Sequence, residues 1–198
     1  MIYRLSEYLT ELLIEAGSIE KKDRNIYRYG IEIIAVMALN VITIIIIGYA
    51  MGMLLDCVIF LLLFMPLRSY AGGYHNSSFI KCYFLSCSII VISLIGMSYI
   101  NIDVKHIYML LIVCIPCLYI WKVAPIENKN KPMTIEETKK NRLKTRILVL
   151  LYLAVGNFSF VFENFLVVKI IISVLWITMV LMIIEIIEIE YSWNRKKR

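Results

Sequence analysis

The fold is decided by residues 31–50, which read IEIIAVMALNVITIIIIGYA and carry one charged side chain, Glu32. A helix rises about 1.5 Å per residue, so a run of this length covers the roughly 30 Å of a lipid hydrocarbon layer. The chain is 61% hydrophobic, whereas a soluble domain is about half apolar. We therefore predict an all-α, polytopic integral membrane protein with about six membrane segments. The further apolar runs are residues 54–67, 83–100, 107–121, 147–161 and 165–187.

Two of these runs are short for a full crossing. Residues 54–67 carry Asp56 near their start, which is either an outer-interface residue or a buried functional carboxylate. Residues 147–161 contain Asn157, so a re-entrant hairpin is an alternative there. We expect the first two segments to be joined by a tight turn near Gly48 to Gly52. The same two glycines form a small-xxx-small pair, which favours a homodimer through close helix approach.

Basic residues divide the chain into two sides. Cytoplasmic loops collect Lys and Arg, and six crossings place nearly all of these residues on one side, with both termini in the cytoplasm. This explains the net charge of +6 by topology, without a nucleic-acid partner. We predict a single membrane-embedded domain, 1–198, that begins with an amphipathic interfacial helix. The basic segments are 1–29, 68–82, 122–146 and 195–198, and only Lys105 and Lys169 lie outside them.

One of the chain's two histidines lies in the polar segment 68–82, together with a cysteine. A cysteine reacts as its thiolate, and His75, Lys81 and Arg68 could supply a base or positive surroundings for Cys82. The adjacent Gly72 and Gly73 would let backbone amides approach a substrate and stabilise an oxyanion. From this spacing alone, an interfacial histidine beside a passive thiol is the alternative.

The spacing of the pair constrains its geometry. Seven residues are two helical turns, so a straight helix would separate the backbones of His75 and Cys82 by about 10 Å. Proton transfer needs roughly 2.6–3.2 Å between heavy atoms. We therefore predict that the helix begins near Asn76 to Ser78 and that the glycine loop folds back to bring the imidazole over Cys82. Neither residue has further partners at metal-ligand spacing, so we predict neither a metal nor another cofactor.

These residues resemble a known signature. Arg68, then Gly72-Gly73, His75, and Cys82 seven residues later are similar to the motif of the AgrB family, the accessory gene regulator B proteins of Gram-positive quorum sensing. Ala124-Pro125, followed by Asn130-Lys131-Pro132, resembles that family's second marker, in the basic loop. Length, six-segment topology and the basic loop agree as well, so the resemblance spans nearly the whole chain.

The resemblance implies a membrane cysteine endopeptidase in a bacterial cell membrane, with its active site at the cytoplasmic face. Cys82 would be the nucleophile and His75 the base, and the partner would be a small AgrD-like precursor peptide, which is cleaved and closed into a thiolactone or lactone signal. Arg68 would bind a substrate carboxylate or face lipid phosphates. Lys129, Lys131, Lys139 and Lys140 would bind an acidic precursor tail or serve only as topology signals.

A different class of function fits the same spans. A peptide permease or transporter without covalent chemistry would also be small and polytopic, and it would remain active without Cys82. The other cysteines lie in or at the edge of apolar runs, where a thiol is expected to act as a small apolar side chain.

Overall fold

The computed structural model describes the backbone of residues 2–72, 79–99, 106–127 and 133–196, and the side chains of residues 3–72, 83–99, 112–127 and 133–191. Within these ranges the regular elements are all helices, as predicted. In chain order they are α1 (Ile2–Glu15), the 3-10 helix η1 (Lys21–Asp23), α2 (Arg24–Ala50), α3 (Leu54–Ala71), α4 (Phe79–Tyr99), α5 (His106–Val123), α6 (Ile135–Val161) and α7 (Phe165–Lys196).

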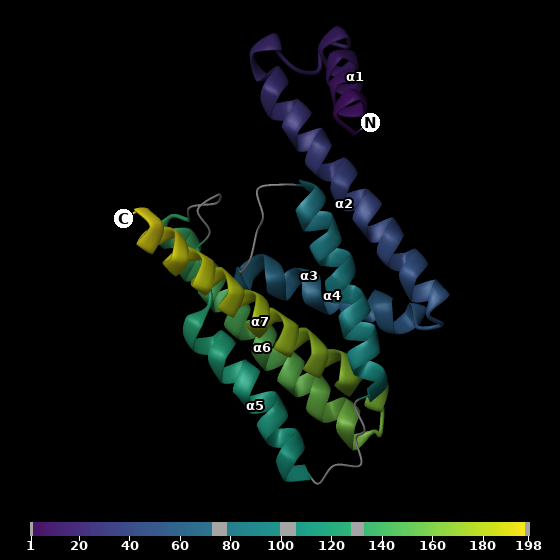
Figure 1. Ribbon diagram of the computed structural model, residues 1–198, viewed down its shortest axis with the longest axis vertical. Coiled ribbons are helices and arrows are strands. Elements are labelled where there is room, and N and C mark those ends of the chain that lie inside the picture. The colour runs from purple at the N-terminus through teal and green to yellow at the C-terminus, as the bar shows by residue number, and fades with distance from the viewer. Residues whose placement is uncertain (1, 73–78, 100–105, 128–132, 197–198) are drawn as a thin grey trace.

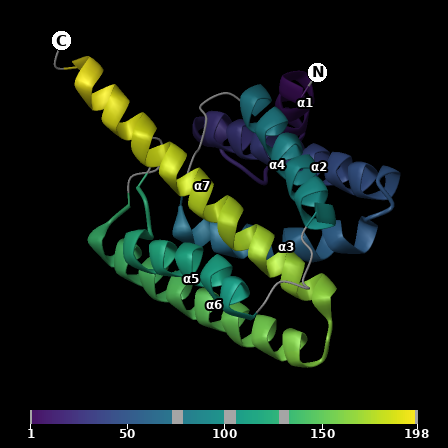
Figure 2. The same cartoon turned by 60° about the horizontal axis from the view of Figure 1, so that its bottom comes forward.

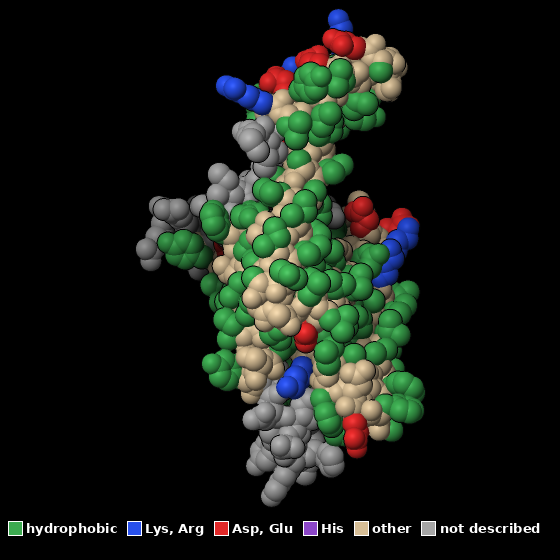
Figure 3. Space-filling view, turned by 90° about the vertical axis from the view of Figure 1, so that its right-hand side faces the viewer, with side chains coloured by type: hydrophobic (Ala, Val, Ile, Leu, Met, Phe, Trp, Pro, Cys, Tyr) green, Lys and Arg blue, Asp and Glu red, His purple; other side chains and the backbone are tan. Residues whose placement is uncertain are grey.

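The predicted membrane segments each correspond to one of the helices α2 to α7. Four of them, α2, α3, α6 and α7, are long and apolar enough to cross a membrane. The other two, α4 and α5, are 21 and 18 residues long, and their parts with described side chains, Tyr83–Tyr99 and Ile112–Val123, are shorter helices that are apolar on average. Figure 3 shows hydrophobic side chains over much of one face, with charged groups at the top, on the right-hand edge and near the bottom of the view. The prediction of a polytopic all-α membrane protein is confirmed.

The turn between α2 and α3 lies where the glycines predict it. Gly52 occupies this turn with a positive φ of 68°. Gly48 lies against Cys57 of α3, and an added Cβ on Gly48 would come within 2.7 Å of the Cβ of Cys57. Gly48 therefore serves close packing within one chain. The homodimer stays a prediction, without support from this residue.

Helix α6 is longer than the apolar run that predicts it. It is one continuous helix of 27 residues, so the re-entrant alternative for residues 147–161 is wrong. Its start is fixed by a capping box, in which Thr134 Oγ1 accepts the Glu137 N–H at 3.2 Å and the Glu137 carboxylate accepts the Thr134 N–H at 2.8 Å. Residues 135–146, assigned from the sequence to the basic loop, are thus the first turns of this helix.

The central helix of the bundle is α7. It packs against α3, α4, α5 and α6, and Ile170, Leu175 and Met182 along it are fully buried. No charged residue lies between Lys169 and Glu185, so this part of α7 is apolar on all sides, as expected of a helix surrounded by other helices or by lipid. Figures 1 and 2 show α5, α6 and α7 as neighbouring helices.

Successive helices run in alternating directions. In Figure 1 the start of α2, the end of α3, the start of α4, the end of α5, the start of α6 and the end of α7 all point towards the upper left, and their opposite ends point towards the lower right. This alternation is the one expected of six crossings. It places α1 and the end of α7 on the same side of the bundle.

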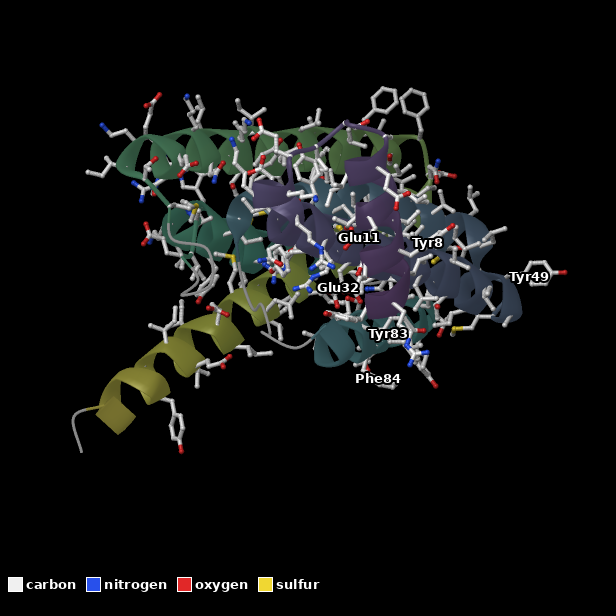
Figure 4. The ribbon with its side chains drawn as sticks, turned by 90° about the horizontal axis from the view of Figure 1, so that it is seen from above. Tyr8, Glu11, Glu32, Tyr49, Tyr83 and Phe84 are labelled. Atoms are coloured by element: carbon white, nitrogen blue, oxygen red, sulfur yellow. The ribbon has the colours of Figure 1, made fainter. Side chains whose placement is uncertain are left out.

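Helix α1 lies beside the start of α2. Arg24 of α2 pairs with Glu7 and Glu11 of α1, at N–O distances of 3.1 and 2.6 Å. On another side of α1, Leu5 and Leu12 remain 50% and 42% exposed. Figure 4 looks onto this end of the molecule and labels Glu11 on α1. The exposed apolar edge is what the predicted interfacial helix would turn towards lipid.

Candidate active site

The segment predicted to be the catalytic loop begins inside a helix. Arg68 lies in the last turn of α3, which ends at Ala71. Leu67 and Ala71, on either side of it, are fully buried, whereas Arg68 itself is half-buried. The end of α3 is therefore anchored in the core, and the chain leaves it towards the segment that contains His75 from a fixed point.

Gly72 brings two distant loops together. Its backbone has φ 77° and ψ −160°, a region that only glycine occupies readily. It forms a parallel bridge with Ile126, and the Ile126 N–H donates to the Ala71 carbonyl at 3.0 Å. A Cβ on Gly72 would overlap the Ile126 carbonyl oxygen. The missing side chain of Gly72 therefore permits the contact with Ile126, and the expected contact of its backbone amide with a substrate stays a prediction.

The second loop carries the other resembling motif. Ile126 directly follows Ala124-Pro125, and Ala124 is 2% exposed. The motif that contains Gly72 and the motif that contains Ala124-Pro125 are more than fifty residues apart in the chain, yet their backbones are hydrogen-bonded. The described parts of the two motifs are thus in contact.

Basic side chains of α6 lie over aromatic rings at the same end of the bundle. The Lys144 Nζ is 4.6 Å from the centre of the Tyr70 ring on α3. The Arg146 Cζ is 5.0 Å from the centre of the Trp121 ring on α5. Both distances are within the range of cation–π attraction. The basic first half of α6 is therefore held against the ends of the two helices that lead into the loops of Gly72 and Ile126.

The lysines predicted to bind a precursor tail divide into two groups. Lys139 and Lys140 lie on the first turns of α6 and are exposed. Lys140 also pairs with Glu136, at 2.9 Å, in an ion pair whose side chains are 67% and 78% exposed, so the pair is solvated and weak. Lys129 and Lys131 lie outside the described residues.

The predicted catalytic pair is described only in part. Cys82 and Lys81 lie in the first turn of α4, which is described from Phe79 onwards, but their side chains are outside the described part. Gly73 and His75 are outside it altogether. The distance between His75 and Cys82, the folding back of the loop and the helix start near Asn76 to Ser78 therefore stay predictions. The remaining thiols, Cys57, Cys87, Cys114 and Cys117, are free.

A family model supplies the decisive comparison. The model described as accessory gene regulator B matches residues 6–186, which include every candidate site residue. This chain belongs to the AgrB family. An AgrB-like protein of Clostridium perfringens (strain SM101 / Type A) is 28% identical over 167 residues, which cover 81% of this chain and 78% of that relative. A second AgrB-like protein, from Clostridium perfringens (strain 13 / Type A), is 27% identical over the same shares. No solved structure matches this chain.

Membership of the AgrB family has direct consequences. It connects this membrane protein with the processing of a quorum-sensing peptide, and it implies an AgrD-like precursor as the partner. Among the described residues of this AgrB-family chain, no group of three His, Cys, Asp or Glu side chains could hold a metal ion.

Sequence reasoning missed the residues that join the two motifs in this AgrB-family protein. Ile126 carries no polar group that would mark it as part of a site, and its contribution comes from its backbone. Tyr70 and Trp121 lie on different helices from their basic partners, Lys144 and Arg146. The helical periodicity of the sequence relates residues within one helix only, so it cannot predict these contacts. The available signal was the presence of two motifs in one chain, which suggests that they meet.

Proposed function

We propose that this protein is a membrane-embedded cysteine endopeptidase that removes the carboxy-terminal tail of an AgrD-like precursor and promotes closure of the remaining peptide into a thiolactone or lactone. The observation that carries the proposal is the backbone contact between Gly72 and Ile126. It joins the loop that precedes His75 to the loop of the second motif, as expected if both loops contribute to one site.

In the first step, Cys82 attacks a backbone carbonyl carbon of the precursor while His75 takes the thiol proton. The tetrahedral oxyanion collapses, the peptide C–N bond breaks, and the imidazolium gives its proton to the leaving amine. The products are the free tail and a thioester between Cys82 and the rest of the precursor.

In the second step, a thiol or hydroxyl side chain within the bound precursor attacks this thioester. His75 takes the proton of the attacking group, the new thioester or ester bond closes the ring, the bond to Cys82 breaks, and the imidazolium returns the proton to the Cys82 thiolate. Exchange of one thioester for another is nearly balanced in free energy, so water must be kept away from the acyl-enzyme. Intramolecular attack favours ring closure, because well-oriented groups reach effective molarities of about 10⁵ M or more.

The basic residues suggest where the substrate binds. The first turns of α6 present exposed Lys139 and Lys140 at the bundle end where Gly72 and Ile126 meet. An acidic precursor tail would be attracted to this segment by long-range charge. The same excess of Lys and Arg supports a cytoplasmic location for this end, where Arg68 would bind a substrate carboxylate or face lipid phosphates.

The test is reconstitution of the full-length protein in lipid vesicles with its precursor peptide, followed by mass spectrometry. We expect the wild type to release the tail and to form an adduct on Cys82. Cys82→Ala and His75→Ala should be inert. Cys114→Ala, which removes another thiol in an apolar helix, should behave like the wild type and serves as the control.

Two outcomes would decide against the proposal. Normal cleavage by Cys82→Ala would exclude covalent catalysis by this residue and would favour a transporter. Tail release without any Cys82 adduct, under conditions that trap thioesters, would point to direct hydrolysis.

A further inference from the structure

The amino-terminal end of α4 is joined to α2 by polar side chains within two apolar helices. The Tyr83 hydroxyl oxygen lies 2.9 Å from the Thr43 hydroxyl oxygen of α2. One turn further along α4, the Cys87 sulfur lies 3.9 Å from the Asn40 side-chain oxygen. Figure 4 shows Tyr83 beside Phe84 at this end of α4. The neighbouring side chains of α2 are apolar. These polar contacts therefore form only when α4 is rotated about its axis so that Tyr83 and Cys87 face α2.

The direction of the bond between Tyr83 and Thr43 can be assigned. The Thr43 hydroxyl donates its proton to the Leu39 carbonyl, at 2.9 Å. A hydroxyl group has one proton to donate, so in the contact with Tyr83 the oxygen of Thr43 accepts and Tyr83 donates. The acceptor is thereby held against the backbone of α2. In apolar surroundings a tyrosine hydroxyl has few other hydrogen-bond partners. Such a bond therefore favours one arrangement of the two helices, although its free energy is small.

This bond is made by the residue directly after the proposed nucleophile, Cys82. Ile90, Leu94 and Met97, which are at most 2% exposed, anchor α4 in the core, but they begin about two turns beyond Tyr83. The contact of Tyr83 with α2 adds a constraint at the first described side chain of the helix, about two turns before those core residues.

Cys82 directly precedes Tyr83, so the two share the rotation of the first turn. Adjacent helical residues lie about 100° apart around the axis. Holding Tyr83 on the α2 side therefore sets the position of Cys82 on another side of α4. By helical register, Ser93 lies on the same side, eleven residues or about three turns later.

We propose that Tyr83, bonded to Thr43, is a positioning residue that sets the rotation of the first turn of α4 and thereby holds Cys82 in place for attack on the precursor. This inference rests on the proposed function for its effect on turnover. Tyr83 itself takes no part in bond making or proton transfer. A displacement of about 1 Å at a reacting group can lower the rate about a hundredfold, so a modest loss of constraint has a measurable effect.

The experiment compares Tyr83→Phe, Thr43→Val and Thr43→Ser in the full-length protein in vesicles. Tyr83→Phe and Thr43→Val each remove one partner of the bond, and Thr43→Ser keeps the acceptor. We expect the first two to lower kcat for tail release about tenfold, with KM changed less than about twofold. Thr43→Ser should stay within about twofold of the wild type. The double variant should be no slower than either single variant, because both remove the same bond.

The control is Thr178→Val. Thr178 is fully buried in α7 and its hydroxyl donates to the Val174 carbonyl of the same helix, so the change removes a buried hydroxyl without removing a contact between helices. It should leave kcat within about twofold of the wild type. A wild-type kcat in Tyr83→Phe, or additive losses in the double variant, would overturn the inference.

A second measurement separates this inference from the proposed function. The rate at which a maleimide alkylates Cys82 is followed by mass spectrometry without any precursor present. We expect Tyr83→Phe and Thr43→Val to change this rate at least threefold and Thr43→Ser to leave it unchanged. If Cys82→Ala still cleaves the precursor, the peptidase proposal fails, but the alkylation rates still report the positioning of Cys82. Equal rates in all variants would overturn the positioning itself.

Discussion

At the scale of single residues, Gly72 is the position where backbone geometry matters most. Its φ and ψ of 77° and −160° lie in a region that costs other residues on the order of 1–3 kcal/mol. A side chain there would also overlap the Ile126 carbonyl oxygen. A side chain at position 72 would therefore both strain the backbone and clash with Ile126. Either effect would weaken the contact between Gly72 and the segment of Ala124-Pro125.

Gly72→Ala should therefore lower tail release by at least about tenfold and reduce stability by about 1–3 kcal/mol. The measurement is turnover in vesicles together with the midpoint of thermal unfolding. Gly96→Ala on α4 is the matched control, because no atom lies within 4 Å of the added Cβ and its φ is not positive. Loss of activity to the same degree in both variants would show that Gly72 has no special role.

At the scale of elements, α6 combines two functions in one helix. Its second half is apolar, as expected of a membrane span, whereas basic side chains of its first half lie over Tyr70 and Trp121. At about 1.5 Å per residue its 27 residues extend roughly 40 Å, which exceeds the roughly 30 Å hydrocarbon layer. The first turns of α6 therefore extend beyond the hydrocarbon, where Lys139 and Lys140 can meet a soluble peptide tail.

The double variant Lys139→Gln/Lys140→Gln should raise KM for the precursor about three- to tenfold at low salt, with little change in kcat. The effect should diminish near 1 M salt, where the screening length is about 3 Å. Steady-state kinetics over a range of ionic strength checks this. Lys21→Gln/Lys22→Gln, which changes two exposed lysines near α2, is the control. An equal rise of KM in the control would indicate a general charge effect rather than a tail-binding segment.

At the scale of the whole molecule, six helices alternate in direction and bring the two ends of the chain to one side (Figure 1). The central helix α7 holds the bundle together, because it packs against α3, α4, α5 and α6. The candidate site lies at the same end as α1, the start of α6 and the end of α7. This end carries most of the Lys and Arg residues, as expected of a cytoplasmic face.

Labelling of introduced cysteines tests this topology. Ile135→Cys at the start of α6 should react with a membrane-impermeant maleimide only in inverted vesicles. Met51→Cys, in the turn before α3, and Phe162→Cys, after α6, should react only in right-side-out vesicles. The labelled peptides are identified by mass spectrometry, with the unsubstituted protein as control. Labelling of Ile135→Cys and Phe162→Cys from the same side would mean that α6 does not cross the membrane.

The sequence by itself determined the class of fold, because apolar length and the placement of Lys and Arg are local properties. It located the turn near Gly52 and six membrane segments, and its motifs identified the AgrB family. It placed the start of α6 too late, because the first turns of this helix are mostly polar and basic and lack the apolar run that marks a span.

Only the tertiary structure decided which distant residues meet. The contact of Gly72 with Ile126 and the bond from Tyr83 to Thr43 join residues that no periodicity relates. The Gly72 contact depends on backbone groups and on a missing side chain, neither of which leaves a pattern in composition. The bond from Tyr83 depends on how α2 and α4 are rotated against each other, which is settled by the packing of the whole bundle around α7.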